Sequence, residues 1–291
     1  MTPRRPAGIL APVTSPFDAS GEIDTASLRK NIAQALADGL AGVVIAGSTG
    51  EAPLLERDEQ RRLTAAAREA IPADRWLLVG TGAESTRAAI ALSRDAGAER
   101  ADAVLVRPPG YYAPMLDPEA VLLHFRAVAD ASPVPVLLYN IPKYAPVSIT
   151  VEMLARICDH PNVIGIKDSS GNPANLEAYR AAVPAWAVLV GSASHLKRAL
   201  ELRCEGGILG AACFWAAACV ELERLVKGGD APGAERLQTR IAGVDREIVG
   251  KLGPAGIKAA MDLVGLAGGA PRAPLRPLGA AERERVKALI R

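Results

Sequence analysis

The sequence predicts a (β/α)8 barrel, the TIM-barrel fold, with a helical extension at its C-terminal end. Three observations support this prediction. Eight short apolar runs recur between Gly8 and Phe214, segments with helical periodicity separate them, and the strand pattern stops after Phe214. The length of 291 residues is also suitable, because a single barrel of this kind needs about 250 residues.

The eight runs are rich in β-branched and other apolar residues and end in Gly, Ser, Thr or Pro. In chain order they are GILAPVTSPF from Gly8, GVVIAGSTG from Gly42, WLLVGTG from Trp76, ADAVLVRPP from Ala101, VPVLLYNIP from Val134, NVIGIKDSS from Asn162, AVLVGSAS from Ala187 and GGILGAACF from Gly206. Strands that alternate with helices are parallel, because each connection must cross over. An open doubly wound sheet is the alternative. It usually has fewer strands and a Gly-rich nucleotide turn after the first strand, where this chain has PVTSPF.

Amphipathic segments such as DTASLRKNIAQALADG and ERDEQRRLTAAAREAI lie between the runs and predict helices. After Phe214, helices are predicted in AACVELERLVKGG, GAERLQTRIAGVDREIVGKLG, PAGIKAAMDLVGLAGG and AAERERVKALIR, and APRAPLRPLG is a linker before the last of them. We therefore expect a barrel over residues 1–215 and a helical extension over residues 216–291, which belong to one structural unit.

Composition and charge exclude several classes of protein. Hydrophobic residues make up 49% of the chain and the mean hydropathy is +0.14, so a large core is possible and disorder is not expected. A net charge of +2 gives no indication of a nucleic-acid or membrane partner. The longest apolar stretch, Gly206 to Val220, is shorter than the roughly 20 residues of a membrane span. The N-terminus is a poor signal peptide, so we expect a cytoplasmic protein with reduced cysteines.

The active site of a (β/α)8 barrel lies at the carboxyl ends of its strands, so reactive side chains at those ends are candidates for function. Most strand ends carry Gly, Pro or small residues. The exceptions are Ser48, Thr49, Tyr139, Lys167 and Ser192, with Tyr111 and Tyr112 on the loop beyond the fourth run.

Side chains alternate between the two faces of a strand. An inward-pointing Lys167 therefore predicts that Val163 and Gly165 also point into the barrel, whereas Ile164 and Ile166 face the helices. Gly165 would leave space just below the lysine. The neighbouring strand ends in a tyrosine, which we expect to meet the lysine over the barrel mouth.

Lys167 is suited to Schiff-base chemistry. An amine must be neutral to attack a carbonyl, and at a reference pKa near 10.4 only about 0.04% is neutral at pH 7. Lowering the pKa to about 7 requires roughly 4–5 kcal/mol of differential destabilisation of the charge, which partial burial can supply. A lysine that only caps a strand in solvent is the alternative. However, only eight of the 34 basic residues are lysines, and Lys167 alone ends an apolar barrel strand.

Two other strand ends allow both a functional and a structural interpretation. The small residues of AGSTGE can present backbone N–H groups and the hydroxyls of Ser48 and Thr49 to the carboxylate of a keto acid. An ordinary turn with a serine helix cap explains them equally well. Tyr139 is either a core aromatic residue or a proton shuttle, with Ser48 and another tyrosine as relay.

No metal or other cofactor is expected from the sequence. His124, His160 and His195 are scattered and lack the spacing of metal ligands. The segment VGTGAES, from Val79 to Ser85, superficially resembles a phosphate loop. It lacks the Gly-Lys-Ser/Thr ending, so we interpret it as a strand-to-helix turn.

The motifs GSTGE, YNIP and GIKDSSG, in this order and at these separations, resemble the dihydrodipicolinate synthase/N-acetylneuraminate lyase family. The resemblance covers nearly the whole chain, and the combination of motifs is highly specific. It implies a (β/α)8 barrel with a helical C-terminal extension that acts on pyruvate or a related 2-oxo acid. It also implies a homotetramer built as a dimer of dimers.

The resemblance implies roles for individual residues. Lys167 would be the Schiff-base lysine, and Tyr139 would be the proton-shuttling tyrosine. Ser48, which stands where many relatives have threonine, and Thr49 would bind the carboxylate and help to relay protons. Tyr112 resembles the tyrosine that family members lend across a subunit interface into the neighbouring site. The positions that match the lining of the pyruvate pocket are Gly191, Ser192 and Ile208.

Tyr144 departs from the pattern of the dihydrodipicolinate synthases. In those enzymes an arginine two residues after YN-x-P holds the carboxylate of the second substrate, whereas here YNIP is followed by Lys143 and Tyr144. Lys143 offers a charge but would point elsewhere if the segment is extended. Tyr144 is therefore a candidate for binding the second substrate or fragment. Other segments, including ADASPVPVLLY, HPNVIGIKDSSG, GSAS and PPGYY, resemble the 4-hydroxy-2-oxoglutarate aldolase branch.

Three functions follow from these residues. The first is a class I aldolase that forms an imine between Lys167 and a 2-oxo acid; the branch implies cleavage of 4-hydroxy-2-oxoglutarate to pyruvate and glyoxylate. The second is a 4-hydroxy-tetrahydrodipicolinate (dihydrodipicolinate) synthase that lacks the arginine. The third is a non-catalytic barrel that binds a 2-oxo acid, which would not need Lys167, Tyr139 and Ser48 together.

Overall fold

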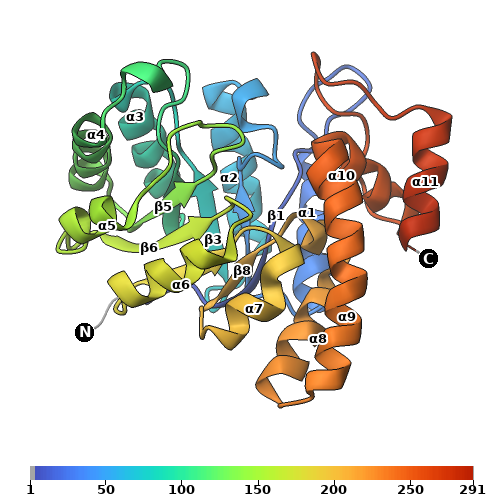
Figure 1. Cartoon of the computed structure of the whole chain (residues 1–291). Coiled ribbons are helices and arrows are strands. Elements are labelled where there is room, and N and C mark those ends of the chain that lie inside the picture. Colours follow the sequence, from blue (N-terminus) through green and yellow to red (C-terminus); the bar gives the residue numbers. More distant parts are fainter. Residues whose placement is uncertain (1–3, 291) are drawn as a thin grey trace.

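Eight parallel strands form a closed barrel in the computed structural model of the chain, which describes residues 4–290 (Figure 1). The strands pair in sequence order, and the last pairs with the first. They are β1 (Gly8–Pro12), β2 (Gly42–Ile45), β3 (Trp76–Gly80), β4 (Ala103–Val106), β5 (Val136–Asn140), β6 (Val163–Asp168), β7 (Ala187–Val190) and β8 (Gly206–Ile208). Each of the eight apolar runs contains one strand, so the predicted fold is confirmed.

Helices follow the strands and cover the outside of the barrel (Figure 1). They are α1 (Thr25–Ala37), α2 (Arg57–Ala70), α3 (Thr86–Ala98), α4 (Pro118–Ala131), α5 (Val151–Ile157), α6 (Pro173–Ala182), α7 (Leu196–Glu201), α8 (Ala216–Lys227), α9 (Ala231–Val244), α10 (Lys251–Leu263) and α11 (Ala280–Ile290). Short 3-10 helices are η1 (Ala52–Leu54), η2 (Ala113–Met115), η3 (Ala193–His195) and η4 (Gly210–Cys213).

Local sequence explains where several helices begin. The carboxylate of Asp24 caps α1 by accepting hydrogen bonds from two backbone N–H groups of the first turn. Glu56 and Glu59 form a reciprocal capping box at the start of α2, and the Ser85 hydroxyl caps α3. Each cap satisfies backbone donors that have no partner within the helix.

The buried apolar side chains form two layers. The outer cluster lies between strands and helices, and a smaller cluster fills the barrel interior, as expected for a barrel of eight strands. The inner cluster includes Leu10, Val44, Leu78, Leu105, Leu137, Tyr139, Ile164, Leu189 and Ile208. Since the interior is packed, a small molecule can bind only at an end of the barrel.

Strand β6 departs from the predicted alternation of side chains. Its pairing with β5 skips one residue between Val163 and Gly165, so Ile164 is the extra residue of a β-bulge. Ile164 packs in the inner cluster and Val163 in the outer one. The predicted positions of these two residues were therefore wrong. Ile166 packs in the outer cluster as predicted. Lys167 is the next residue and therefore points to the inner side, where it lines a cavity.

The helices that follow β8 lie along one side of the barrel (Figure 1). Helix α8 contacts β1 and α7 as well as α9, so it packs on both the barrel and the extension. The proposed division between residues 215 and 216 remains a prediction. Across the described residues 4–290, no helix combines the length and hydrophobicity needed to span a membrane.

The helix predicted from Gly233 to Gly253 is not a uniform α-helix. Helix α9 is followed by η5 (Asp245–Gly250), which has π-helical hydrogen bonding. The backbone then kinks at Gly253, which has a φ of 58° and precedes Pro254. Proline removes a backbone donor, and a positive φ favours glycine. The kink brings this part of the extension to the carboxyl ends of the barrel strands, where both residues line a cavity.

Candidate active site

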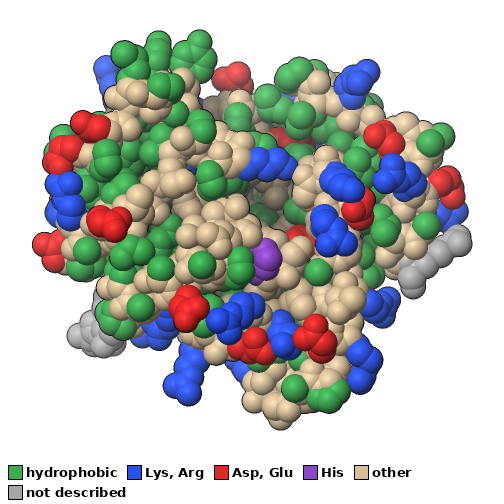
Figure 2. All heavy atoms as spheres, in the orientation of Figure 1, with side chains coloured by type: hydrophobic (Ala, Val, Ile, Leu, Met, Phe, Trp, Pro, Cys, Tyr) green, Lys and Arg blue, Asp and Glu red, His purple; other side chains and the backbone are tan. Residues whose placement is uncertain are grey.

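A cavity of about 160 Å³ lies at the carboxyl ends of the barrel strands. The molecular surface is hollowed near the centre of the view in Figure 2, beside the region of α10. Eight of the nine predicted site residues line this cavity; they are Ser48, Thr49, Tyr139, Tyr144, Lys167, Gly191, Ser192 and Ile208. The structure therefore brings together candidates that five different strands and their loops supply.

Lys167 and Tyr139 are neighbours across the pairing of β5 with β6. The Nζ atom of Lys167 donates a hydrogen bond of 3.2 Å to the Tyr139 hydroxyl, and the Lys167 side chain is almost fully buried. Within residues 4–290 no carboxylate forms an ion pair with this amine. The predicted contact at the barrel mouth is confirmed. An amine held in this way can add to a carbonyl carbon that is placed in the cavity.

The loop after β2 brings Ser48 and Thr49 to the cavity. The loop turns back on itself, because the backbone N–H groups of Glu51 and Ala52 donate to the carbonyls of Ser48 and Gly47. Glu51 has a left-handed backbone conformation with a φ of 58°. In the described part of the chain no side-chain hydrogen bond joins Ser48 to Tyr139, so the predicted proton relay between them remains a prediction.

A buried ion pair fastens this loop to the C-terminal extension. Glu51 Oε1 lies 2.6 Å from Lys258 Nζ, and neither side chain is exposed to solvent. The ammonium group also donates to the carbonyl of Ala270, and the backbone N–H of Arg272 donates to Glu51 Oε2. Burial lowers the pKa of Lys258, and the charge of Glu51 opposes this shift. Lys258 could not be singled out from the sequence, because its partner lies more than two hundred residues away along the chain.

The ends of β5 and β6 are also joined behind the lysine. Asn140 donates a hydrogen bond of 2.6 Å to Asp168 and accepts one of 3.0 Å from the backbone of Ile149. The hydroxyl of Ser170 donates to the other oxygen of Asp168. Burial raises the pKa of Asp168, and these hydrogen bonds oppose the shift. Asn140 and Asp168 directly follow Tyr139 and Lys167 in the sequence, and that adjacency was the signal that could have identified them.

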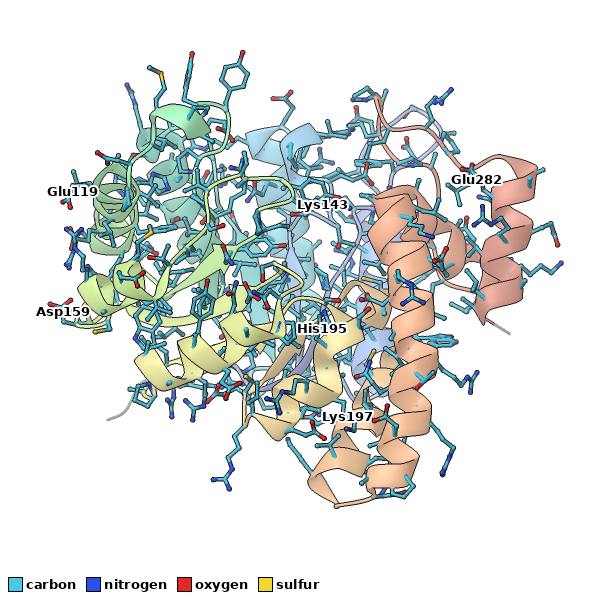
Figure 3. All side chains as sticks on the ribbon, viewed as in Figure 1. Glu119, Lys143, Asp159, His195, Lys197 and Glu282 are labelled. Carbon is cyan, nitrogen blue, oxygen red and sulfur yellow. The ribbon has the colours of Figure 1, made fainter. Side chains whose placement is uncertain are left out.

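The loop after β5 forms a turn and is not extended. The backbone N–H groups of Tyr144 and Ala145 both donate to the carbonyl of Ile141. The turn directs Lys143 across the mouth, where its Nζ atom donates a hydrogen bond of 2.8 Å to the carbonyl of Gly250. Figure 3 shows Lys143 near the centre of the view, close to α10. Lys143 therefore lines the cavity, whereas in an extended segment its side chain would point away from the cavity.

Elements of the extension complete the cavity wall. The residues of the extension that line the cavity, none of which the sequence indicated, are Asp245, Val249, Gly250, Gly253, Pro254 and Ile257. A single aspartate in an amphipathic helix carries no distinctive pattern, so Asp245 could be found only from the folded structure. A second cavity of about 920 Å³ adjoins the first and shares Ser48, Tyr139, Tyr144 and Pro254 with it.

Tyr112 is the one predicted site residue that does not line the cavity of its own chain. Its side chain is 65% exposed and lies beside Tyr111 and Met115, which are 79% and 80% exposed. The Glu84 carboxylate supports this loop by accepting hydrogen bonds from the backbone N–H groups of Gly110 and Tyr111. The loop is thus ordered but presents a group of apolar side chains to solvent.

No group of three or more His, Cys, Asp or Glu side chains within residues 4–290 is arranged to hold a metal ion. Among the histidines that the sequence analysis considered as ligands, His124 is buried and its Nδ1 atom lies 3.0 Å from the Thr86 hydroxyl. His160 lies 3.0 Å from Asp130. Neither of these two histidines lines the cavity that contains Lys167.

Comparisons with known proteins agree with this geometry. Residues 5–291 match the model of the dihydrodipicolinate synthetase family. A probable mitochondrial 4-hydroxy-2-oxoglutarate aldolase of Emericella nidulans is 36% identical over 273 residues, which cover 92% of this chain and 88% of the relative. A 4-hydroxy-tetrahydrodipicolinate synthase of Acidiphilium cryptum is 33% identical over 293 residues, 97% of each chain.

Solved structures of the same family superpose on the whole barrel. YagE, a prophage protein of the dihydrodipicolinic acid synthase family from E. coli K12 that was solved in complex with pyruvate, is 27% identical with a TM-score of 0.92. A dihydrodipicolinate synthase from Bacillus anthracis is also 27% identical and has a TM-score of 0.94. Each comparison covers 98% of this chain and 97% of the other. The motifs, the barrel and these matches together show that the chain belongs to the dihydrodipicolinate synthetase family.

Proposed function

We propose that this enzyme is a class I aldolase that cleaves a 4-hydroxy-2-oxo acid to pyruvate and a second carbonyl compound, with 4-hydroxy-2-oxoglutarate as substrate and glyoxylate as the second product. The observation that carries the proposal is the buried Lys167 amine at the barrel mouth, 3.2 Å from the Tyr139 hydroxyl and without a carboxylate partner among the described residues. The name of the Emericella nidulans relative supports this choice of substrate.

The proposed reaction begins when the Lys167 amine adds to the C2 carbonyl and Tyr139 donates the proton with which the carbonyl oxygen leaves as water, which gives an iminium ion and the phenolate of Tyr139. Tyr139 takes the proton of the C4 hydroxyl, the C3–C4 bond breaks, and its electron pair moves into the iminium group to form an enamine. The second carbonyl compound leaves, the enamine is protonated at C3, and hydrolysis releases pyruvate and the free lysine. In this scheme Ser48 and Thr49 bind the carboxylate on C1 and help to move protons, and Ser48 completes the relay to Tyr112.

The remaining site residues shape the cavity in this proposal. Gly191 and Ile208 lie against the pyruvyl part of the substrate. Tyr144 and Lys143 lie on the side from which the second fragment leaves, and the Lys143 ammonium group provides a charge for a distal carboxylate. A dihydrodipicolinate synthase is the second candidate, because relatives named 4-hydroxy-tetrahydrodipicolinate synthase are 33% and 34% identical. Tyr144, at the position where those synthases have arginine, favours the aldolase. A barrel that only binds 2-oxo acids would not require the contact between lysine and tyrosine.

Borohydride reduction in the presence of pyruvate tests the lysine directly. We expect a reduced pyruvyl adduct on Lys167, identified by mass spectrometry of peptides. Lys167→Ala should lose the adduct and all turnover while circular dichroism remains unchanged. Lys30→Ala, which removes an exposed lysine of α1, is the matched control and should behave like the wild type. An adduct on another lysine, or none, would refute the mechanism.

A panel of substrates separates the candidate reactions. The panel contains 4-hydroxy-2-oxoglutarate, 2-keto-3-deoxygluconate, N-acetylneuraminate, and pyruvate with aspartate semialdehyde. We expect the highest kcat/KM with 4-hydroxy-2-oxoglutarate. Preferential turnover of aspartate semialdehyde would instead establish the synthase, and an adduct without turnover of any member would support a binding protein.

We further propose a homotetramer in which Tyr112 enters the site of a neighbouring chain. The exposed Tyr111, Tyr112 and Met115 support an interface at this loop, because monomers rarely expose such groups of large apolar side chains. Mixing Lys167→Ala with Tyr112→Phe tests it. If the tyrosine acts between chains, mixed dimers have one complete site, and activity should return to roughly a quarter of the wild-type level. No recovery after subunit exchange would place Tyr112 outside the partner's site.

We also propose that the enzyme works in the cytoplasm. Its four cysteines are free, and three of them are buried. Free thiols are typical of a reducing compartment. Cell fractionation with an antibody to the native protein would test the proposal, and recovery in an organelle or outside the cell would contradict it.

A further inference from the structure

Asp245, the first residue of the π-helical segment η5, forms part of the cavity wall. Its side chain is 5% exposed, and it lines the same cavity as Lys167 and Ser192. Segments of π-helix are rare and occur frequently at functional sites. A carboxylate in this position therefore requires a physical explanation.

The two oxygens of Asp245 have different surroundings. The Oδ2 atom accepts hydrogen bonds from the hydroxyl of Ser192 at 2.7 Å, the backbone N–H of Ser194 at 2.9 Å and the hydroxyl of Ser194 at 2.8 Å. The Oδ1 atom is buried and has no hydrogen-bond partner within residues 4–290. A buried carboxylate oxygen without a partner is unfavourable, because desolvation is not compensated. Because Asp245 lines the cavity, a small turn of its side chain would expose this acceptor to a ligand.

Ser192 can offer only an acceptor to the cavity. Its single hydroxyl proton is donated to Asp245, and its oxygen already accepts a hydrogen bond of 3.3 Å from the backbone N–H of Ser194. A hydroxyl group has one donor and two lone pairs, so the remaining capacity of Ser192 is one lone pair. The aspartate thus determines the direction of the serine hydrogen bond.

We propose that Asp245 and Ser192 form an acceptor site for a hydroxyl group of the substrate, and that this site selects 2-oxo acids with a hydroxyl on the carbon chain beyond C3. This inference rests on the proposed aldolase function. The hydroxyl of a 4-hydroxy-2-oxo acid donates to this site while the substrate binds, which orients the C4–O bond before Tyr139 removes the proton. The hydroxyl has one proton and donates to one of the two acceptors, whereas a 2-oxo acid without the hydroxyl supplies no donor, and such sites discriminate strongly against analogues that lack the donor.

Asp245→Asn is the main test, because it keeps the shape of the side chain. The amide oxygen can still accept from the two serines, whereas the amide nitrogen replaces the free acceptor with a donor. Ser192→Ala removes the second acceptor and serves as an independent variant. Ser194→Ala is the matched control, because Ser194 also donates to Asp245 but does not line the cavity.

The measurements compare 4-hydroxy-2-oxoglutarate with 2-oxoglutarate, which lacks only the hydroxyl. We expect Asp245→Asn to lower kcat/KM for the hydroxylated substrate by tenfold to a hundredfold. The affinity for 2-oxoglutarate, measured by borohydride trapping on Lys167, should change less than threefold. Ser192→Ala should also lower kcat/KM for 4-hydroxy-2-oxoglutarate more than the affinity for 2-oxoglutarate, but by a smaller factor than Asp245→Asn. Ser194→Ala should change neither this kcat/KM nor this affinity by more than about threefold.

The possible results distinguish this inference from the proposed function. Equal losses of affinity for both compounds, or unchanged kcat/KM in both Asp245→Asn and Ser192→Ala, would overturn the acceptor site while the aldolase remained established. If the wild-type enzyme does not cleave 4-hydroxy-2-oxoglutarate, the proposed function itself fails. An unfolded Asp245→Asn protein, detected by circular dichroism, would leave Ser192→Ala to decide.

Discussion

Breaking the ion pair between Glu51 and Lys258 should destabilise the protein strongly. Both side chains are 0% exposed, and their charged atoms are 2.6 Å apart. Removing one partner leaves the other charge buried without compensation, which typically costs about 3–5 kcal/mol. We therefore expect Glu51→Gln and Lys258→Met each to lower the free energy of unfolding by about 3–5 kcal/mol. The double variant has no unpaired charge and should lose less than either single variant.

Urea unfolding at pH 7 and one protein concentration, followed by circular dichroism, measures these free energies. Lys251→Met provides the matched control, because Lys251 lies 2.7 Å from Glu247 but is 60% exposed. Surface pairs contribute about 0–1 kcal/mol, so this variant should remain close to the wild type. The reasoning is wrong if the single substitutions cost less than about 1 kcal/mol, or if the cost of the double substitution equals the sum of the two.

The same perturbation should reach the active site, because Glu51 belongs to the loop that carries Ser48 and Thr49. In Glu51→Gln we expect weaker binding of pyruvate, measured as the concentration that gives half-maximal borohydride trapping on Lys167. Unchanged trapping in a variant that has lost stability would show that the ion pair supports the fold without positioning the loop.

Three further predictions follow from other parts of the structure. A Cβ atom on Gly165 would lie 2.4 Å from the carbonyl oxygen of Ala187, so Gly165→Ala should cost about 1–3 kcal/mol in urea unfolding, and wild-type stability would contradict this close approach. Burial lowers the pKa of His124 to about 4. Between pH 6.5 and 4 the unfolded chain then binds more protons than the folded chain. The free energy of unfolding should therefore decrease by up to about 3 kcal/mol as the pH is lowered through this window. His124→Gln should flatten that dependence in unfolding experiments at pH 7 and pH 5. Finally, Tyr139→Phe should slow turnover by a factor of about 100 or more but still form the pyruvyl adduct on Lys167; full activity would remove this hydroxyl from proton transfer.

The barrel could be predicted from the sequence because each strand and each helix has its own local pattern. The contact between Lys167 and Tyr139 was also predictable, since both residues end neighbouring parallel strands. The bulge at Ile164 was not, because an extra residue in one strand is defined only by its pairing with another. Asp245 and Lys258 were missed for a related reason. Each acts through a partner far away in the sequence, and nothing in the local pattern around either residue indicates that partner.

The bulge in β6 has a consequence for water near the reactive amine. Ile164 packs inside the barrel, and Gly165, the next residue, has no space for a side chain because the carbonyl of Ala187 lies close to its Cα. Ile164 therefore adds an apolar side chain to the inner cluster, whereas a strictly alternating strand would have turned it toward the helices. A chain one residue shorter at this point would still aim its lysine at the mouth, but the interior would lack this isoleucine and would exclude water from the amine less completely.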